Sequence, residues 1–177
     1  FYDDWAADYD QNLKDWTYQA PQVAARLLKA SVPLDGKILD AGCGTGLSGE
    51  ALQAAGYQDI TGMDISQDSL TIASKTGAYT ELSQVNMQEL PLPYEADVFD
   101  GLQCVGVLTY VPDTVGILRE FCRVVRPGGL VVFTQRDDLF AKRNCEAVLA
   151  QLQADRLWTR VSVSDPQPYL PDNDEYG

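Results

Sequence analysis

The stretch Lys37–Gly49, with the sequence KILDAGCGTGLSG, constrains the fold more than any other part of the chain. Its first residues form a short apolar run without helical spacing, which predicts a buried strand over residues 37–42. Three glycines in alternate positions follow. Apolar residues then recur three and four apart, which predicts a helix over residues 46–55. A strand, a glycine turn and a helix in this order are the opening of a nucleotide-binding βαβ unit.

The spacing of the glycines narrows the kind of ligand. Gly42 and Gly44 allow positive φ and let a ligand approach the backbone, and the helix that follows directs its free N–H groups at the turn. A dinucleotide fingerprint requires Gly-x-Gly-x-x-Gly, but Leu47 stands at its third glycine position. Asp64 ends the next strand, predicted over 59–64, and its carboxylate can accept both hydroxyls of a ribose. The pattern therefore indicates a ribose-containing ligand and argues against a nicotinamide dinucleotide.

The run ILDAGCGTG, followed by GMDIS, resembles motif I and the acidic end of strand two in class I S-adenosylmethionine (SAM)-dependent methyltransferases. This resemblance implies an α/β fold with a Rossmann-like, doubly wound and mostly parallel sheet. It also implies SAM as methyl donor and S-adenosylhomocysteine as product. The cofactor contacts that it implies are Tyr9, Tyr18, Gly42, Gly44, Asp64, Ile65, Asn86, Met87 and Cys104.

Two of these contacts need comment. In the family a polar residue at the position of Asn86 holds the adenine amino group, and the backbone N–H of Met87 meets the ring. Asp is more usual than Asn, but the side-chain oxygen of Asn can still accept a hydrogen bond. For the Met87 side chain, a plain core methionine is the alternative.

The amino-terminal residues 1–31 are expected to form one or two helices. Tyr2, Trp5 and Tyr9 are spaced three and four apart and so share a helix face. The face either packs onto the sheet or, as the similar family segment implies, forms a lid over the methionine end of the cofactor. In a second helix over 20–30, Val23, Leu27 and Ala30 would make the core-facing stripe.

The remaining chain alternates strands and helices, as a doubly wound sheet requires. Beyond the first two strands we expect, in order, a helix over 67–75 with Ser66 as its N-cap, a strand over 79–85, a strand over 99–107, a helix over 113–125, a strand over 130–134, a helix over 139–154 and a strand over 157–164. No partner strand follows in 165–177, so the carboxy-terminal strand pair is expected to be incomplete. The whole chain, 1–177, thus predicts one methyltransferase domain with a lid (1–31), a core (37–164) and an irregular tail (165–177).

Composition excludes several function classes. A net charge of −13 argues against nucleic acid as a partner. No apolar run approaches the roughly 18 residues that a membrane span needs, and no secretory signal is visible. The four cysteines have no Cys-x-x-Cys spacing, and histidine is absent, so neither a metal site nor a His-containing triad is expected. We therefore expect a cytoplasmic protein with a small-molecule partner, no nucleic acid and no membrane.

The function predicted from these observations is direct, in-line methyl transfer from SAM to a small molecule or metabolite. The alternative is a protein that binds SAM or S-adenosylhomocysteine without turnover, as a sensor or scaffold. Tyr9, Tyr110 and Asp137 lie near the expected mouth of the site, but each has an equally good surface or packing role, so the catalytic residues stay unassigned.

A finer resemblance concerns the subfamily. The segments FYDDWAADYDQ at the amino terminus, Tyr18-Gln-Ala-Pro21 and Tyr169-Leu-Pro171 are similar to the Williams–Beuren syndrome region methyltransferase-like proteins.

Overall fold

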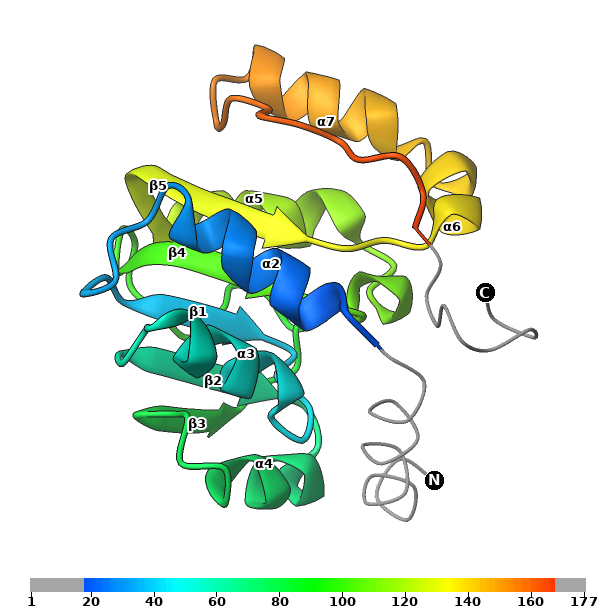
Figure 1. Ribbon diagram of the computed structural model, residues 1–177. Helices are drawn as coiled ribbons and strands as arrows, with labels where there is room; N and C mark the ends of the chain where they lie inside the picture. The colour runs from blue at the N-terminus through cyan, green and yellow to red at the C-terminus, as the bar shows by residue number, and fades with distance from the viewer. Residues whose placement is uncertain (1–17, 168–177) are drawn as a thin grey trace.

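A five-stranded parallel sheet forms the centre of the molecule in the computed structural model, which describes residues 18–167 (Figure 1). The strand order is β3-β2-β1-β4-β5, and all four neighbouring pairs are parallel. The strands are β1 (Ile38–Ala41), β2 (Ile60–Asp64), β3 (Glu81–Gln84), β4 (Phe99–Cys104) and β5 (Val125–Phe133). This order confirms the predicted Rossmann-like fold.

Helices cover both faces of the sheet. They are α2 (Ala20–Lys29), α3 (Leu47–Ala55), α4 (Gln67–Ser74), the 3-10 helix η1 (Leu108–Tyr110), α5 (Thr114–Val124), α6 (Asp137–Lys142) and α7 (Cys145–Ala154). Side chains alternate along a strand, so β1 contributes Ile38 to a core cluster with α2 and α3 and Leu39 to a second cluster with α5 and α7. Figure 1 shows α2 beside α3.

Local capping interactions fix three of the helix ends. The hydroxyl oxygen of Ser66 accepts a hydrogen bond from the Ser69 N–H at 3.2 Å, which confirms it as the N-cap of α4. Asp113 caps α5 in the same way by accepting from the Gly116 N–H at 2.9 Å. Gly56 ends α3 in the left-handed conformation with φ 115°.

The helix expected over 139–154 is wrong in its bounds, because two helices stand there. Asn144 has φ 49° and turns the chain between α6 and α7. A left-handed residue cannot continue an α-helix, and Asn adopts this conformation more readily than most residues. The break turns α7 relative to α6, and α7 then reaches the core through Leu149 and Leu152.

The strand expected over 157–164 does not form. Residues 158–167 are irregular, and Val161 is 80% exposed. Alternation of apolar and polar residues is a local pattern, whereas a strand also needs a neighbour to complete its hydrogen bonds. In the described part of the chain no strand pairs with the outer edge of β5. The incomplete carboxy-terminal pair therefore lacks both of its strands within 18–167, and the tail beyond 167 lies outside the described residues.

The buried face of α2 also differs from the expected one. Val23 and Leu27 are 41% and 48% exposed, while Ala24, Ala25 and Leu28 are buried. The helix is therefore rotated by about one residue from the predicted stripe. Small alanines let α2 approach α3, and Leu28 fills the space above Gly101, where a Cβ would lie 3.0 Å from it.

No helix in residues 18–167 is both long and apolar enough to cross a lipid bilayer.

Candidate cofactor site

The glycine turn between β1 and α3 has the predicted left-handed backbone. Gly42, Gly44 and Gly46 have φ of 79°, 52° and 108°. The N–H groups of Gly42 and Cys43 both donate to the Met63 carbonyl, at 2.8 and 2.9 Å, and these bonds tie the turn to β2. These two backbone bonds hold the start of the turn against the end of β2.

Gly42 and Gly44 each require a glycine, but for different steric reasons. A Cβ at Gly42 would lie 2.5 Å from Val107, so this glycine is required by the loop that follows β4. A Cβ at Gly44 would meet no atom within 4 Å. Open space at Gly44, in a turn whose backbone can be approached closely, is where a ligand would lie against the chain.

The carboxylate of Asp64 stands directly at this turn. Its Oδ2 accepts the Gly44 N–H at 2.9 Å, and its Oδ1 accepts the Ser66 N–H at 2.9 Å. The residue is half-buried at the carboxyl end of β2, the edge at which open α/β sheets bind their ligands. Next to it the Ile65 side chain is 59% exposed, and the Ile65 carbonyl accepts from Gln84 Nε2 at 2.9 Å. The structure therefore brings Gly44, Asp64 and Ile65 together as predicted.

The two residues expected near adenine follow β3. Asn86 Oδ1 accepts the Gln88 N–H at 3.0 Å, and its Nδ2 donates to Glu89 at 2.9 Å. The Met87 side chain is 8% exposed and belongs to the core. The core alternative therefore holds for this side chain, and only the Met87 backbone is available to a ligand.

Cys104 is completely buried at the end of β4. Its carbonyl accepts the Thr134 N–H at 3.0 Å, and burial raises the pKa of its thiol. A thiol kept neutral in the core is neither a nucleophile nor a ligand group. A cofactor contact at this position would run through the backbone.

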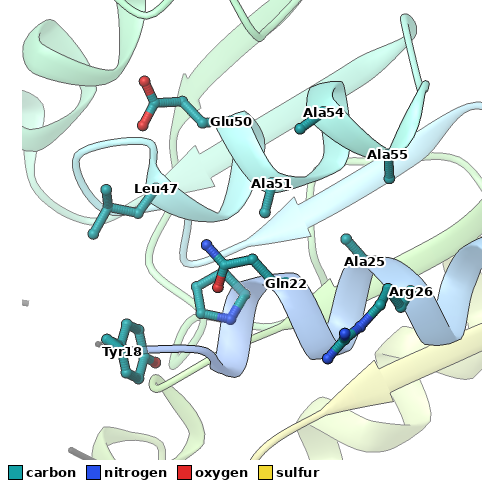
Figure 2. A pocket seen from close by; sticks show the side chains of 10 residues that line it. Tyr18, Gln22, Ala25, Arg26, Leu47, Glu50, Ala51, Ala54 and Ala55 are labelled. Carbon is teal, nitrogen blue, oxygen red and sulfur yellow. The ribbon is translucent and has the colours of Figure 1, made fainter. Parts of the chain in front are cut away.

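Tyr18 lies at one end of a groove between α2 and α3 with a volume of about 460 Å³ (Figure 2). Leu47, Glu50 and Ala51 of α3 line it together with Gln22 and Ala25 of α2, and Figure 2 shows Ala51 directed toward Gln22. A Cβ at Gly106 would lie 3.2 Å from the Tyr18 hydroxyl, so Tyr18 also borders the loop that follows β4. Tyr9, like Tyr2 and Trp5, lies outside the described residues.

The loop that follows β4 is held by Arg143, a residue that the sequence did not single out. The Arg143 guanidinium donates to the carbonyls of Leu108, Thr109 and Val111 at 2.8, 2.8 and 3.1 Å. It thereby fixes η1, which carries the exposed Tyr110. Arg143 and η1 are 32 or more residues apart, and no local pattern announces such a contact.

Arrangement and chemistry together suit an adenosine-containing cofactor. A half-buried carboxylate can accept ribose hydroxyls, an exposed isoleucine offers an apolar surface to a flat base, and the open side of Gly44 admits a chain beyond the ribose. The fold and this site define a class I SAM-binding methyltransferase domain.

Comparison with known proteins agrees with this assignment to the methyltransferases. The family model described as "Methyltransferase domain" matches residues 39–133, and the chain belongs to this family of SAM-dependent methyltransferases. It is 35% identical to human methyltransferase-like protein 27 over 94% of this chain and 75% of that protein. It is 35% identical to the ubiquinone biosynthesis O-methyltransferase of Bordetella avium over 66% of this chain and 51% of that protein. The chain thus spans about half the length of this bacterial relative.

Solved structures place the fold in the same class. A SAM-dependent methyltransferase from Mesorhizobium loti aligns with a TM-score of 0.53 and 28% identity, over 64% of this chain and 54% of that one. A chain of the complex between the Haloferax volcanii Trm112 methyltransferase activator and a putative methyltransferase aligns with a TM-score of 0.64 over 88% of this chain and 72% of that one. Its identity is 20%, so it supports the fold alone.

Proposed function

We propose that this chain transfers a methyl group from SAM to a small-molecule acceptor by direct in-line displacement. The observation that carries the proposal is the contact between Asp64 and Gly44, which puts a ribose-accepting carboxylate beside the open glycine turn. SAM supplies a methyl group already activated by its sulfonium. The tasks left to the chain are to hold the cofactor, to orient the acceptor and to exclude water.

The proposed cofactor contacts are those predicted from the sequence. Asp64 accepts the ribose hydroxyls, Ile65 packs on the adenine, and Asn86 and the Met87 backbone bind its edge. Gly42 and Gly44 border the methionine portion, as do Tyr9 and Tyr18, and Cys104 contributes through its backbone. The catalytic residues stay unassigned, because no group near the turn is yet distinguished as a base.

Names of relatives support a small-molecule acceptor. Two are a ubiquinone biosynthesis O-methyltransferase and, in Bacillus licheniformis, a demethylmenaquinone methyltransferase, which is 39% identical over 58% of this chain and 45% of that protein. A third, of known structure, is the sugar N-methyltransferase KedS8, with 26% identity. These acceptors differ in kind, so the acceptor class proposed for this chain stays at the level of a small molecule.

A second candidate is binding of SAM or S-adenosylhomocysteine without methyl transfer. One observation favours it: the [4+2]-cyclase SpnF is 30% identical to this chain and aligns with a TM-score of 0.53. A protein named for a cyclisation therefore shares this fold, so the fold alone does not decide for methyl transfer.

Three further assignments belong to the same proposal. Residues 1–177 act as one domain whose amino-terminal segment forms a lid. The Williams–Beuren syndrome region subfamily is proposed on the segments that resemble it. A cytoplasmic location is proposed because Cys43, Cys104, Cys122 and Cys145 are all free thiols, which is typical of a reducing compartment.

The test has two stages. Isothermal titration with SAM, S-adenosylhomocysteine and NAD first establishes the cofactor, and we expect the first two to bind and NAD not to. A screen of hydroxylated aromatics, amines and sugars then measures formation of S-adenosylhomocysteine. Turnover with one class supports methyl transfer, whereas tight SAM binding without turnover across all classes would favour the second candidate.

A further inference from the structure

The short helix η1 is held in place by side chains from two distant parts of the chain. The Arg143 guanidinium donates to the carbonyls of residues 108, 109 and 111, and Gln88 Nε2 donates to the Tyr110 carbonyl at 3.3 Å. Every carbonyl from 108 to 111 is therefore bound by a side chain. The Tyr110 side chain, in contrast, is 59% exposed. Rigid support under an exposed aromatic ring is what a surface preorganised for a ligand needs.

Gln135 follows β5 and lies next to η1. Its Oε1 accepts from the Thr109 hydroxyl at 3.3 Å and from the Arg136 N–H at 3.1 Å. A backbone N–H can only donate, so the second bond fixes which end of the amide is the oxygen. Gln135 Nε2 is shielded from solvent and has no hydrogen-bond partner among the described residues. An unpaired buried donor is costly, so its presence here requires an explanation.

Both features lie at the edge of the sheet that carries the proposed cofactor site. β4 and β5 run parallel to β1, so their carboxyl ends lie at the same edge as the glycine turn. Val107, directly before η1, reaches the turn, since a Cβ at Gly42 would lie 2.5 Å from its side chain. The Gly106 N–H donates to the Thr134 hydroxyl at 2.8 Å, which joins the same loop to the residue before Gln135. A ligand held by η1 and Gln135 would thus lie beside a cofactor bound at the turn.

We propose that η1 and Gln135 bind the methyl acceptor, with the Tyr110 ring against its plane and Gln135 Nε2 donating to one of its oxygen atoms. The inference rests on the proposed function and narrows the methyl acceptor to a planar molecule that carries a hydroxyl or carbonyl oxygen. An aromatic ring offers a flat apolar surface, and an amide N–H requires an atom with a lone pair. A cationic amine has no lone pair and would leave Nε2 unpaired.

The covered donor becomes accessible through side-chain movement. Gln135 as a whole is half-buried, and Gly106 and Tyr110 near it are exposed. Side-chain rearrangement on binding is common, and it would uncover Nε2 for the oxygen. The bond then forms out of contact with water, where a hydrogen bond is stronger and an unpaired donor more costly. A molecule that uncovers Nε2 without offering it an oxygen therefore binds poorly.

The test measures binding of two probes, catechol and benzylamine, to the complex with S-adenosylhomocysteine by NMR titration. Catechol is planar, neutral and hydroxylated, whereas benzylamine carries a cationic amine on the same kind of ring. We expect the wild type to bind catechol at least about tenfold more tightly. Gln135→Glu keeps the oxygen that Thr109 and Arg136 bind but replaces the donor with an anionic oxygen. It should lower the preference for catechol at least about tenfold.

Two further variants separate this effect from others. Gln58→Glu makes the same change of charge at an exposed position before β2, at the opposite edge of the sheet, and should leave the preference unchanged. Tyr110→Leu removes the flat ring and should weaken both probes by similar factors, again with the preference unchanged. If Gln135→Glu does not fold, Gln135→Leu removes the donor without adding charge and should bring the two affinities within about threefold of each other.

The outcomes separate the inference from the proposed function. An equal preference in the wild type and the Gln135 variant would overturn the inference, as would failure of both probes to bind the wild-type complex. Neither result would affect the proposed function, which depends on the cofactor. Failure of the wild type to bind S-adenosylhomocysteine would overturn the proposed function and this inference with it.

Discussion

The backbone N–H of Gly44 donates to Oδ2 of Asp64 over 2.9 Å, across 20 residues of sequence. This bond joins the end of β2 to the middle of the glycine turn. The other oxygen of the same carboxylate accepts the Ser66 N–H at the start of α4. One side chain therefore sets the relative positions of the turn, the second strand and the next helix.

Replacement of Asp64 tests its role toward the cofactor. Asp64→Ala removes the acceptor for the ribose hydroxyls, and each charge-assisted bond lost should cost about 1.5–3 kcal/mol. We expect SAM affinity to fall at least tenfold in titration. Asp68→Ala is the control, because Asp68 is an exposed carboxylate in the first turn of α4 and has no part in the site. Unchanged affinity in Asp64→Ala would refute the assignment.

Gly44 offers a test of the turn. Gly44→Val should abolish SAM binding, because the side chain would fill the open space beside the turn. It should also cost about 1–2 kcal/mol of stability, since φ is positive there. Gly77→Val is a closely matched control: Gly77 has φ 71° and a Cβ there also meets no atom within 4 Å, but it lies after α4. Normal binding by Gly44→Val would mean that the turn is only structural.

The amino-terminal lid leads to a prediction about exchange rates. Residues 1–17 lie outside the described structure, and Tyr18, where the description begins, already borders the groove and the loop after β4. If the aromatic face of the lid covers the cofactor, amide hydrogen exchange of residues 1–20 should slow when S-adenosylhomocysteine binds. Equal protection in both states would assign Tyr2, Trp5 and Tyr9 to permanent packing.

Arg143 should stabilise the segment that follows β4. Arg143→Met removes three hydrogen bonds to the carbonyls of residues 108–111 and should lower the free energy of unfolding by about 1–3 kcal/mol. Amide exchange should accelerate over residues 106–111, with SAM affinity kept within about threefold. Arg156→Met, at an exposed position after α7, is the control for loss of charge. No change in exchange over 106–111 would contradict the role of Arg143.

What could be predicted from the sequence was what local chemistry determines. The glycine turn, the Ser66 cap and the carboxylate that ends β2 all follow from short runs of residues, and each stands where it was expected. The general order of strands and helices follows from the period of the apolar residues, which is likewise local.

The errors concern contacts between distant segments. Residues 157–164 alternate like a strand but pair with no strand of the described chain. The exposed faces of Val23 and Leu27 depend on how closely α2 approaches α3. The Tyr79 hydroxyl donates to Asp40, 39 residues away, and Arg143 donates to the Leu108 carbonyl, 35 residues away. These partners meet only when the chain folds. Local patterns carry no information about such partners.

The account rests on SAM lying between the open side of Gly44 and the carboxylate of Asp64. A crystal structure of the complex with S-adenosylhomocysteine measures this directly. We predict that the ribose hydroxyls lie within hydrogen-bond distance of Asp64 and that the chain beyond the ribose passes over Gly44. Binding of the ligand elsewhere, for example in the groove between α2 and α3 without contact to Asp64, would contradict the account.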